Sequence, residues 1–565
     1  MKSINGIDWK INNIPERLIL KNMQIYNISY LLSKIFLEKK YTDDEIYSSI
    51  YNSKDIAINY INTDFEKAGK LISKNLKSHK KILIFGDYDV DGYSSTYLLY
   101  DYFASLGVNC DYYIPDRIID GYGPNLQLLK KIIHKKNYGL VFFVDCGSNS
   151  LDEINYLNNY GVNTIIIDHH QIHEQTKSKK NVIINPLKDH ILTKYSFFCA
   201  TTLVFFFIKY LINILPCKNK SDSKNKYLFF SALATICDQM PLRGYNKQIV
   251  KEGLKNFNLN KFYNLKKLIN VKKKINSSDI GFGLGPLLNS ASRLGFSGLP
   301  FNLLIEKKNL NIVEISNKLV NLNEKRKLNQ IKTFNLLKSK FDMLNKGIIF
   351  KFKTNINEGF LGIIASNFVE LYNKPTFVLT NSSKLIKCSA RSVKGYDIGK
   401  IFYLALKEKI ILKGGGHSMA GGCTLKKEKL KDFENFLNKN FLKKFKNFKN
   451  INYYISEQNF ASLLTFSKKE FQYLEPLGND NTSPFFLVKN NKILKFKIIK
   501  DLHLNLIVKN KYNKSCKCLA FNVIGSKLGE ILMNTKNEID LIIQINNNII
   551  QKNSDFNLII KDAII

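Results

Sequence analysis

Residues 81–103 read KILIFGDYDVDGYSSTYLLYDYF, and this stretch decides the fold. A run of strand-forming residues is followed by three aspartates at alternate positions, Asp87, Asp89 and Asp91, and then by Gly92 and a helical pattern. This order predicts a strand, a tight loop and a helix, the unit from which open α/β sheets are built. The loop is either an ordinary polar turn or a place where cations bind.

Three more short runs resemble the first. They are rich in Ile, Val and Phe without alternation, which is typical of parallel strands buried on both faces. We expect the four strands at 81–86, 139–145, 163–168 and 181–185. Helical segments lie between them, so the first half of the chain is predicted to form a parallel α/β sheet. Ligands of such sheets gather beyond the carboxyl ends of the strands.

Acidic residues follow three of these predicted strands. Beyond the aspartate loop, Asp145 ends the second strand, 168-DHH-170 ends the third, and Asp238 ends a mostly apolar predicted helix. Carboxylates that converge at one sheet edge repel each other unless cations lie among them. Oxygen ligands mixed with imidazoles favour Mn²⁺ or Mg²⁺ over zinc. The number of carboxylates indicates two ions, the arrangement used for in-line attack on phosphorus.

Each motif alone has a simpler interpretation. The DxDxDG segment could be a calcium-type loop, but the Glu expected several residues after the glycine is absent. An isolated DHH could cap a helix. Because acids follow three strands of one predicted sheet, a metal site is favoured over a purely structural role.

The net charge of the chain is +38, from 85 basic and 47 acidic residues among 565. A field of this sign favours polyanions such as nucleic acid, although the abundance of lysine also indicates a coding bias that places lysine on solvated faces. Only six basic residues are arginine, whose planar fork binds phosphate with two hydrogen bonds. Three of the six, Arg117, Arg293 and Arg391, lie in motifs.

The chain shows no pattern of secretion or membrane insertion. Residues 1–18 lack the basic and then apolar order of a leader, and the most apolar run, 199–215, is interrupted by Lys209 and is predicted to be a buried helix. The nine cysteines form no CxxC pair, so neither a disulfide framework nor a zinc ribbon is indicated. We therefore expect a cytoplasmic protein with no membrane attachment.

Four segments resemble, in order and spacing, the motifs of the DHH phosphoesterase superfamily: GDYDVDG at 86–92, VDCG at 144–147, DHH at 168–170 and CDQMPL at 237–242. Further segments resemble the RecJ family of single-strand-specific 5′→3′ exonucleases. They are IPDRIIDGYG at 114–123, FGLGPLLNSASRLG at 282–295, the segment 357–380, CSARS at 388–392, GGGHSMAGG at 414–422 and LEPLGNDNTSPFF at 474–486.

This resemblance implies the fold. A DHH domain with a parallel sheet and a DHHA1 α/β domain would be joined by a long helix and followed by an oligonucleotide-binding (OB) β-barrel. We expect an N-terminal segment at 1–60, the DHH catalytic domain at 61–304, the connecting helix at 305–340, the DHHA1 domain at 341–448 and the OB-like domain at 449–565.

The resemblance also implies roles for the acidic motifs. Asp168 would orient the imidazole of its neighbour, as metal-bound histidines require, and His170 would face the phosphate that is cleaved. The implied metal ligands, with Asp87 in or beside the set, are Asp87, Asp89, Asp91, Asp145, His169 and Asp238.

The basic motifs would bind the substrate. By the resemblance, Arg117, Ser389 and Arg391 hold the 5′-terminal phosphate, which would restrict cleavage to that end of a strand. Arg293 would stabilise charge on the phosphate under attack.

The glycine cluster would lie in the second domain. Gly415 and Gly416 would let backbone N–H groups approach a phosphate chain, and His417 would donate to the substrate or reach the metal centre from the other lobe. Phe and Tyr side chains of the OB-like tail would stack on bases.

Four places depart from the family pattern: Cys146, the segment 198–203, Ser292 and Asn357. None of them removes an implied metal ligand, so we expect an active enzyme.

The implied enzyme is a phosphodiesterase with two Mn²⁺ or Mg²⁺ ions that degrades single-stranded DNA processively from the 5′ end to mononucleotides, in recombination and repair. Its partners would be 5′-phosphorylated single-stranded DNA, a single-strand-binding protein and a helicase, and the chain would be a monomer. Two alternatives stay open. A DHH-family oligoribonuclease or nucleotide phosphatase would not need the OB-like tail, and a non-catalytic single-strand-binding scaffold would not need the acids.

Overall fold

The structure is a computed structural model of the 565-residue chain. It describes residues 3–51, 63–172, 181–188, 193, 195–215, 220–255, 257, 262–269, 275–338, 347–382, 385–393, 395–445, 451–510, 514–546 and 557–565. The predicted domain boundaries at 60, 340 and 448 lie outside these residues. Within the described ranges, no helix is both long enough and apolar enough to cross a membrane.

A five-stranded parallel sheet forms the centre of the first lobe. Its order is β3-β2-β4-β5-β6. Successive residues enter different cores, Ile82 and Ile84 on one face and Leu83 and Phe85 on the other, so the sheet is covered on both sides. The predicted parallel sheet is confirmed. Its strands are β2 (Lys81–Phe85), β3 (Cys110–Tyr113), β4 (Tyr138–Val144), β5 (Asn163–Ile167) and β6 (Asn181–Ile184).

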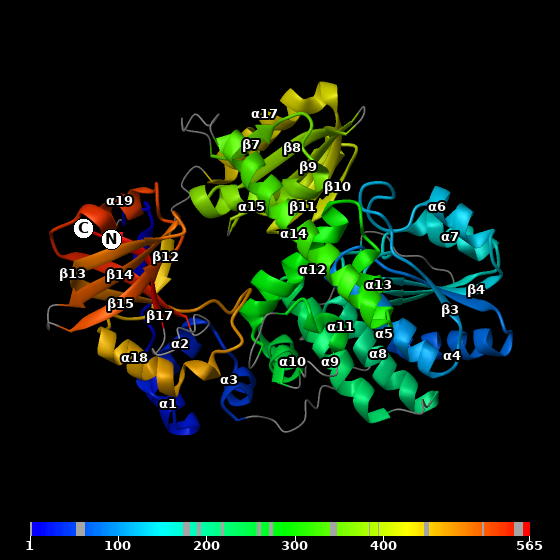
Figure 1. Cartoon of the computed structure of the whole chain (residues 1–565), viewed down its shortest axis with the longest axis horizontal. Coiled ribbons are helices and arrows are strands. Elements are labelled where there is room, and N and C mark those ends of the chain that lie inside the picture. The colour runs from blue at the N-terminus through cyan, green and yellow to red at the C-terminus, as the bar shows by residue number, and fades with distance from the viewer. Residues whose placement is uncertain are drawn as a thin grey trace.

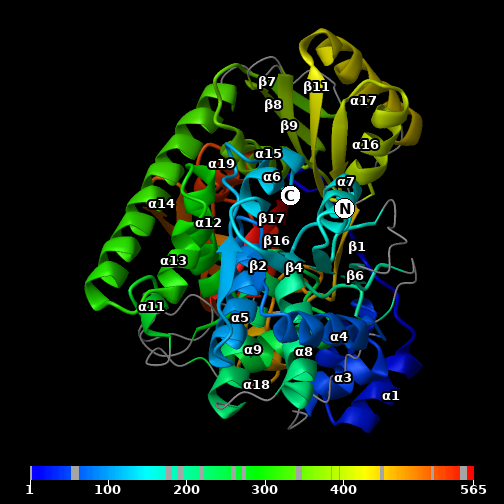
Figure 2. The same ribbon diagram turned by 90° about the vertical axis from the view of Figure 1, so that its right-hand side faces the viewer.

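Helices cover both faces of this sheet (Figures 1 and 2). The helices α4, α5 and α8 share the core of one face, and α6 and α7 share the core of the other. On the first face, α9 packs against α8 and α5, and α10 packs against α9. Their bounds are α4 (Thr63–Lys77), α5 (Val90–Ser105), α6 (Leu126–Ile133), α7 (Leu151–Asn159), α8 (Ala200–Ile214), α9 (Lys220–Cys237) and α10 (Gly244–Lys255).

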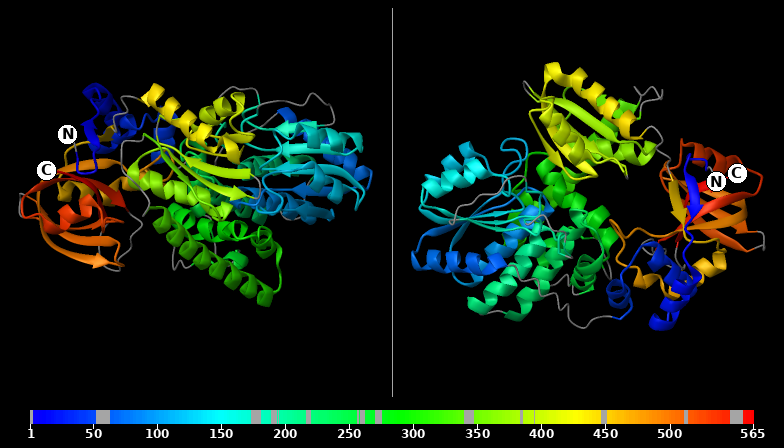
Figure 3. Two further views of the ribbon diagram at one scale, coloured as in Figure 1. Left: turned by 90° about the horizontal axis from the view of Figure 1, so that it is seen from above. Right: turned by 180° about the vertical axis from the view of Figure 1, so that it is seen from behind.

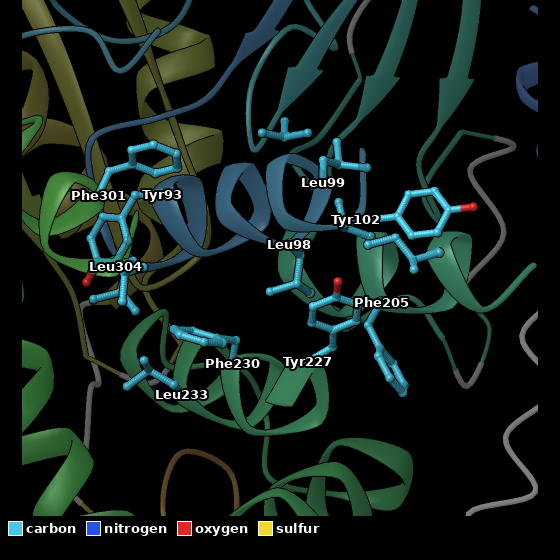
Figure 4. Packing of buried hydrophobic residues seen from close by; sticks show 14 of the residues in the cluster. Tyr93, Leu98, Leu99, Tyr102, Phe205, Tyr227, Phe230, Leu233, Phe301 and Leu304 are labelled. Carbon is cyan, nitrogen blue, oxygen red and sulfur yellow. The ribbon is translucent and has the colours of Figure 1, made fainter. Parts of the chain in front are cut away.

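The core beneath α5 fixes the helix that follows the aspartate loop. Tyr93, Leu98 and Tyr102 of α5 meet side chains of α8, α9 and α13 (Leu299–Ile305) (Figure 4). The Tyr102 hydroxyl donates to the backbone oxygen of Leu215 at 2.8 Å, so the one polar group that this ring brings into the core is paired.

A long helix links the two lobes. After α11 (Tyr263–Lys266), a π-helical segment η1 (Asp279–Leu284) continues directly into α12 (Gly285–Arg293). The chain then passes through α13 into α14 (Asn309–Lys338), which runs from the first lobe to the second (Figure 2). The helix α14 lies within the predicted range of 305–340.

The second lobe contains a mixed five-stranded sheet of order β10-β11-β9-β8-β7. The helix α15 packs on one face, and α16 and α17 pack on the other. The strands are β7 (Ile349–Phe352), β8 (Thr376–Ser382), β9 (Leu385–Arg391), β10 (Lys413–Gly416) and β11 (Ala420–Lys426). The helices are α15 (Glu358–Tyr372), α16 (Ile398–Lys407), the short η2 (Lys427–Lys429) and α17 (Leu430–Phe445).

The C-terminal strands form a closed barrel of order β13-β14-β15-β17-β16. Closure pairs both edges of the sheet, and the predicted OB-type barrel is confirmed. Its elements are β13 (Phe485–Ile499), β14 (His503–Asn510), β15 (Ser515–Ala520), α19 (Lys527–Asn534), β16 (Ile539–Asn546) and β17 (Asn557–Ile564).

The N-terminal segment packs against this barrel, although the two lie at opposite ends of the chain (Figures 1 and 3). The strand β1 pairs in parallel with β12, and Trp9 Nε1 donates to Asp562 Oδ2 at 2.9 Å. We call this unit, residues 3–51 with 451–565, the terminal module. Its remaining elements are β1 (Asp8–Ile11), α1 (Glu16–Tyr26), α2 (Tyr30–Glu38), α3 (Asp43–Ile50), β12 (Ile451–Tyr454), α18 (Phe460–Lys469) and η3 (Phe471–Tyr473).

One junction fastens the terminal module to the first lobe. Arg243 donates to both carboxylate oxygens of Glu45, from Nε at 3.0 Å and from Nη2 at 2.6 Å, and lies over the ring of Tyr41. Beside it, the backbone N–H of Leu242 donates to the backbone oxygen of Asn479 at 2.8 Å. This contact lies four residues after Asp238, so the junction adjoins the end of α9.

Candidate active site

The carboxyl ends of β2, β4 and β5 bring the acidic motifs together. The three strands are neighbours in the sheet, and each is followed directly by acids: the aspartate loop 87–91 after β2, Asp145 after β4, and 168–170 after β5. The fourth motif reaches the same edge from α9, which ends one residue before Asp238.

The imidazole of His169 lies among three carboxylates from three elements. Its Nε2 atom is 3.2 Å from Asp145 Oδ1, 3.5 Å from Asp238 Oδ2 and 3.7 Å from Asp91 Oδ2. Asp87, Asp89 and Asp145 form an adjoining group with ligand atoms within 4.8 Å of one another, and Asp145 is shared between groups. The structure therefore brings all six predicted ligands into one cluster.

Two oxygens of this cluster accept no hydrogen bond from the described residues. Asp87 Oδ1 is buried without a hydrogen bond among the described residues, and so is Asp145 Oδ1, which lies near His169 Nε2 but outside hydrogen-bond geometry. Asp145 also has a φ of +60°, a conformation that non-glycine residues rarely adopt. Buried carboxylate oxygens without donors are costly, and a cation between them would remove that cost.

The electrostatics of the cluster also favour a bound cation. Burial and the neighbouring carboxylates raise the pKa of Asp87, Asp145 and Asp238 well above the usual range. Burial and then the charge of His170 lower the pKa of His169 to about 4, so its imidazole is neutral and can ligate a metal. Carboxylates that cannot easily all be ionised at once would be stabilised by one or two bound divalent cations.

Asp91 faces the cluster and also accepts hydrogen bonds from the start of α8. Its carboxylate accepts hydrogen bonds at 2.7 Å from the backbone N–H groups of Ala200 and Thr201, at the start of α8. The Thr201 hydroxyl adds a third bond to Asp91 Oδ1 at 2.6 Å. The segment 198–203, which departs from the family pattern, thus supplies the donors that hold this aspartate.

The structure corrects the role expected of Asp168. Its Oδ1 atom lies 2.7 Å from Nδ1 of His170, so it orients that imidazole rather than the imidazole of His169. The cause is local: the same oxygen accepts the backbone N–H groups of His169 and His170, and Ser148 N donates to the other oxygen. This turn leaves the Asp168 carboxylate facing His170.

His170 is held as a cation near the junction of the lobes. Burial would lower the pKa of His170, but the charge and hydrogen bond of Asp168 outweigh burial and raise it to about 9. The Tyr122 hydroxyl lies 3.2 Å from Nδ1 of His170, and the ring of His417 stacks at 5.9 Å between centroids. His417 belongs to the second lobe, so it reaches the edge of the cluster.

The two glycines predicted to bind substrate differ in their surroundings. Gly416 has a φ of +151°, and a Cβ there would collide with the backbone oxygen of Ala420, so this position requires glycine. A Cβ at Gly415 would meet nothing within 4 Å, so the space on that side of the strand is open.

The three motif arginines are near enough to influence one another. Burial and then the charges of Arg117 and Arg391 lower the pKa of Arg293 to about 9. Arg117 lies over the ring of Tyr88 at 5.0 Å, in the aspartate loop. In the second lobe, a Cβ at Gly362 would lie 3.0 Å from Arg391 Nη2 and 3.1 Å from Ser389 Oγ, so α15 approaches this pair closely. Arginines from two lobes thus form a place for an anion.

Sequence reasoning did not single out three residues that the structure adds. Tyr122 contacts His170, Tyr88 lies under Arg117, and Asn289 Oδ1 accepts the backbone N–H of Val90 at 3.1 Å, inside the aspartate loop. All three lie within recognised motifs, but nothing in the motif spacing shows which polar side chains turn toward the cluster.

Comparisons with known proteins agree with this architecture. Three family models match: the DHH family N-terminal domain at residues 81–235, the DHHA1 domain at 345–443 and the RecJ OB domain at 462–562.

Curated relatives carry the name single-stranded-DNA-specific exonuclease RecJ. The protein of Bacillus subtilis is 25% identical over 533 residues, which are 91% of this chain and 66% of that protein. The protein of Escherichia coli is 29% identical over 393 residues, 65% of this chain and 67% of that protein. The chain spans about two thirds of the length of these relatives.

Among solved structures, RecJ of Thermus thermophilus in complex with Mn²⁺ matches with a TM-score of 0.80 and 20% identity, over 99% of this chain and 79% of that one. A likeness at this identity shows the common fold. The sheet, its acidic edge and the matching domains place the chain in the DHH superfamily of phosphoesterases. Within that class, the chain is similar to RecJ, because the RecJ OB model matches its C-terminal part and the relatives that match most of the chain carry that name.

The charge of the cluster yields a prediction about metal and stability. Adding Mn²⁺ to metal-free protein should raise the melting temperature by several degrees, because an ion that binds only the folded state stabilises it by about 2.7 kcal/mol at a hundred times its dissociation constant. Asp145→Asn should lose most of that increase. Asp111→Asn is the matched control, since Asp111 lies in the same sheet but pairs with Lys136. An equal increase in Asp145→Asn and wild type would contradict the assignment.

Proposed function

We propose that this chain is a single-strand-specific 5′→3′ deoxyribonuclease that uses two Mn²⁺ or Mg²⁺ ions and releases mononucleotides. One observation carries the proposal: buried carboxylates with His169 at one sheet edge adjoin arginines that come from both lobes. Relatives named single-stranded-DNA-specific exonucleases, similar over most of this chain, support it.

The residues fit two neighbouring ions. Asp87, Asp89 and Asp145 would hold one, and Asp91, His169 and Asp238 would hold the other. When bound, such ions neutralise charge on the phosphate and lower the pKa of a water molecule.

The protein's own groups orient the phosphate. His170, charged at neutral pH because Asp168 holds its Nδ1 proton, can donate to a phosphate oxygen as negative charge develops. Arg293 is anchored by Nη1, which donates to the backbone oxygen of Gly359 at 2.7 Å, so its guanidinium is fixed where α12 meets the second lobe. His417 would add a second donor beside His170.

Polarity would follow from an anion pocket at one end of the path. Arg117 from the first lobe and Ser389 with Arg391 from the second would hold the 5′-terminal phosphate. A strand gripped by its end at a fixed distance from the ions is cut only near that end. Gly415 lies on β10, two strands from Ser389 in the same sheet, and would offer its backbone to the strand.

We further propose the wider context. The DHH domain would span 61–304 and the DHHA1 domain 341–448, joined by 305–340, while 1–60 and the OB-like domain 449–565 would hold the approaching strand. The chain would act as a monomer in the cytoplasm on 5′-phosphorylated single-stranded DNA, with a single-strand-binding protein and a helicase. The excess of basic residues supports DNA as the substrate.

An end-label assay tests the activity. With Mn²⁺, a 5′-phosphorylated single strand should yield mononucleotides from its 5′ end, and matched duplex and RNA strands should be cut far more slowly. Asp145→Ala should lower the rate by at least about a hundredfold while still binding the strand, because it removes a ligand and not a packing group. Release of nucleotides from the 3′ end, or near-normal cleavage by Asp145→Ala, would contradict the proposal.

A second assay tests the end pocket. Arg391→Lys should lose most of the preference for a 5′-phosphate over a 5′-hydroxyl strand, because an ammonium cannot form the paired hydrogen bonds of a guanidinium. Initial rates on the two matched strands at one salt concentration give the preference ratio. Arg17→Lys is the control, since Arg17 is an exposed arginine of α1 in the terminal module. If Arg391→Lys lowers the rates on the 5′-phosphate strand and the 5′-hydroxyl strand equally, Arg391 does not bind the terminal phosphate.

A further inference from the structure

One face of the helical segment formed by η1 and α12 lies along the proposed substrate path. Between residues 282 and 293, the side chains that are not buried are Phe282, Pro286, Asn289 and Arg293. Their spacing of four, three and four residues places them on a single helical face. A strand bound at one end of this face would therefore also pass the side chains at its other end.

The C-terminal half of this face adjoins the active site. Asn289 accepts the backbone N–H of Val90 between Asp89 and Asp91, so the middle of the face touches the aspartate loop. Arg293 is bonded to Gly359 of the second lobe and lies within the electrostatic influence of Arg117 and Arg391. This end of the face is the end at the phosphate pocket.

The N-terminal end points toward the terminal module. Ser277, two residues before η1, donates to the backbone oxygen of Leu477 at 2.9 Å. A Cβ at Gly285 would lie 2.5 Å from Cys237 Sγ, so the helix is pressed against the residue that precedes Asp238. Phe282 is seven residues from Asn289, about 10 Å along the axis, toward the end of the segment that contacts Leu477 of the terminal module.

The ring of Phe282 is open to a partner. It is 87% exposed, although most of its helix is buried. Its sequence neighbours are Gly281 and Gly283, which have no side chains to cover the ring, and a Cβ at Gly283 would meet nothing within 4 Å. An aromatic ring in this setting can stack on a planar group of any sequence.

We propose that Phe282 is a base-stacking residue that positions the single strand on the 3′ side of the cleaved phosphate. The inference rests on the proposed function: a strand held by its 5′ phosphate near Arg293 and crossing the aspartate loop would run along this face toward Phe282. Phe282 touches a base that does not react, so it is a positioning residue.

The test compares Phe282→Ala with Phe282→Tyr and with the control Leu310→Ala, whose side chain is 86% exposed in the first turn of α14. Each enzyme is given a 5′-phosphorylated 20-mer that is either intact or carries a single abasic site. The site is placed at each of positions 2 to 6 in turn. Phe282→Ala should raise KM about tenfold with little change in kcat, the size expected for one lost stacking contact. Phe282→Tyr and Leu310→Ala should behave as wild type.

The abasic series separates stacking from a structural effect. At one position, removing the base should raise the KM of wild type as much as Phe282→Ala does, and should raise the KM of Phe282→Ala no further. The inference would be overturned if the abasic sites raised the KM of wild type and of Phe282→Ala equally at every position. A KM of Phe282→Ala equal to that of wild type on the intact strand would also overturn it.

A binding measurement distinguishes this inference from the proposed activity. In the Asp145→Ala background, strands carry a single 2-aminopurine at each of positions 2 to 6 in turn, and at one position both the affinity and the quenching of that base should fall when Phe282 becomes alanine. If no enzyme cleaves DNA but this quenching depends on Phe282, the nuclease proposal fails and the stacking residue stands. If cleavage is as proposed but quenching is unchanged, only the stacking residue is contradicted.

Discussion

The repulsion among buried carboxylates at one edge of the parallel sheet is the constraint on which this structure depends. Burial and mutual charge raise the pKa of Asp87, Asp145 and Asp238, so the cluster is unfavourable at neutral pH without cations. The scaffold holds it in place by several means. The α8 amides fix Asp91, and the large core beneath α5 fixes the aspartate loop. Repulsion among these carboxylates destabilises the metal-free fold, and a bound cation would remove that repulsion.

The rest of the molecule surrounds that cluster with groups from other parts of the chain. The second lobe contributes His417 beside His170 and Arg391 within electrostatic reach of Arg293, and the long helix α14 links the two lobes. The terminal module is fastened at Arg243 and Leu242, close behind Asp238. A movement of the module relative to the first lobe would therefore act on the end of α9 that carries a predicted ligand.

The sequence predicted those parts of the fold that have a local signal. The strands of the first sheet are continuous apolar runs, and the site acids follow them directly, so their gathering at one edge could be predicted. The strand β3, CDYY, is missed because an edge strand is only partly buried and this one carries a charge. The packing of Trp9 on Asp562 was also beyond sequence reasoning, because it joins residues from the two ends of the chain. The turn that directs Asp168 toward His170 depends on backbone hydrogen bonds that no residue pattern specifies.

The central claim is that two cations resolve the repulsion in this cluster, and anomalous diffraction tests it most directly. Crystals of the full chain grown with Mn²⁺ would be measured on both sides of the manganese absorption edge. The account predicts two anomalous peaks in the cluster, one bounded by Asp87, Asp89 and Asp145 and the other by Asp91, His169 and Asp238. An anomalous map with no peak among these residues at saturating Mn²⁺ would contradict it.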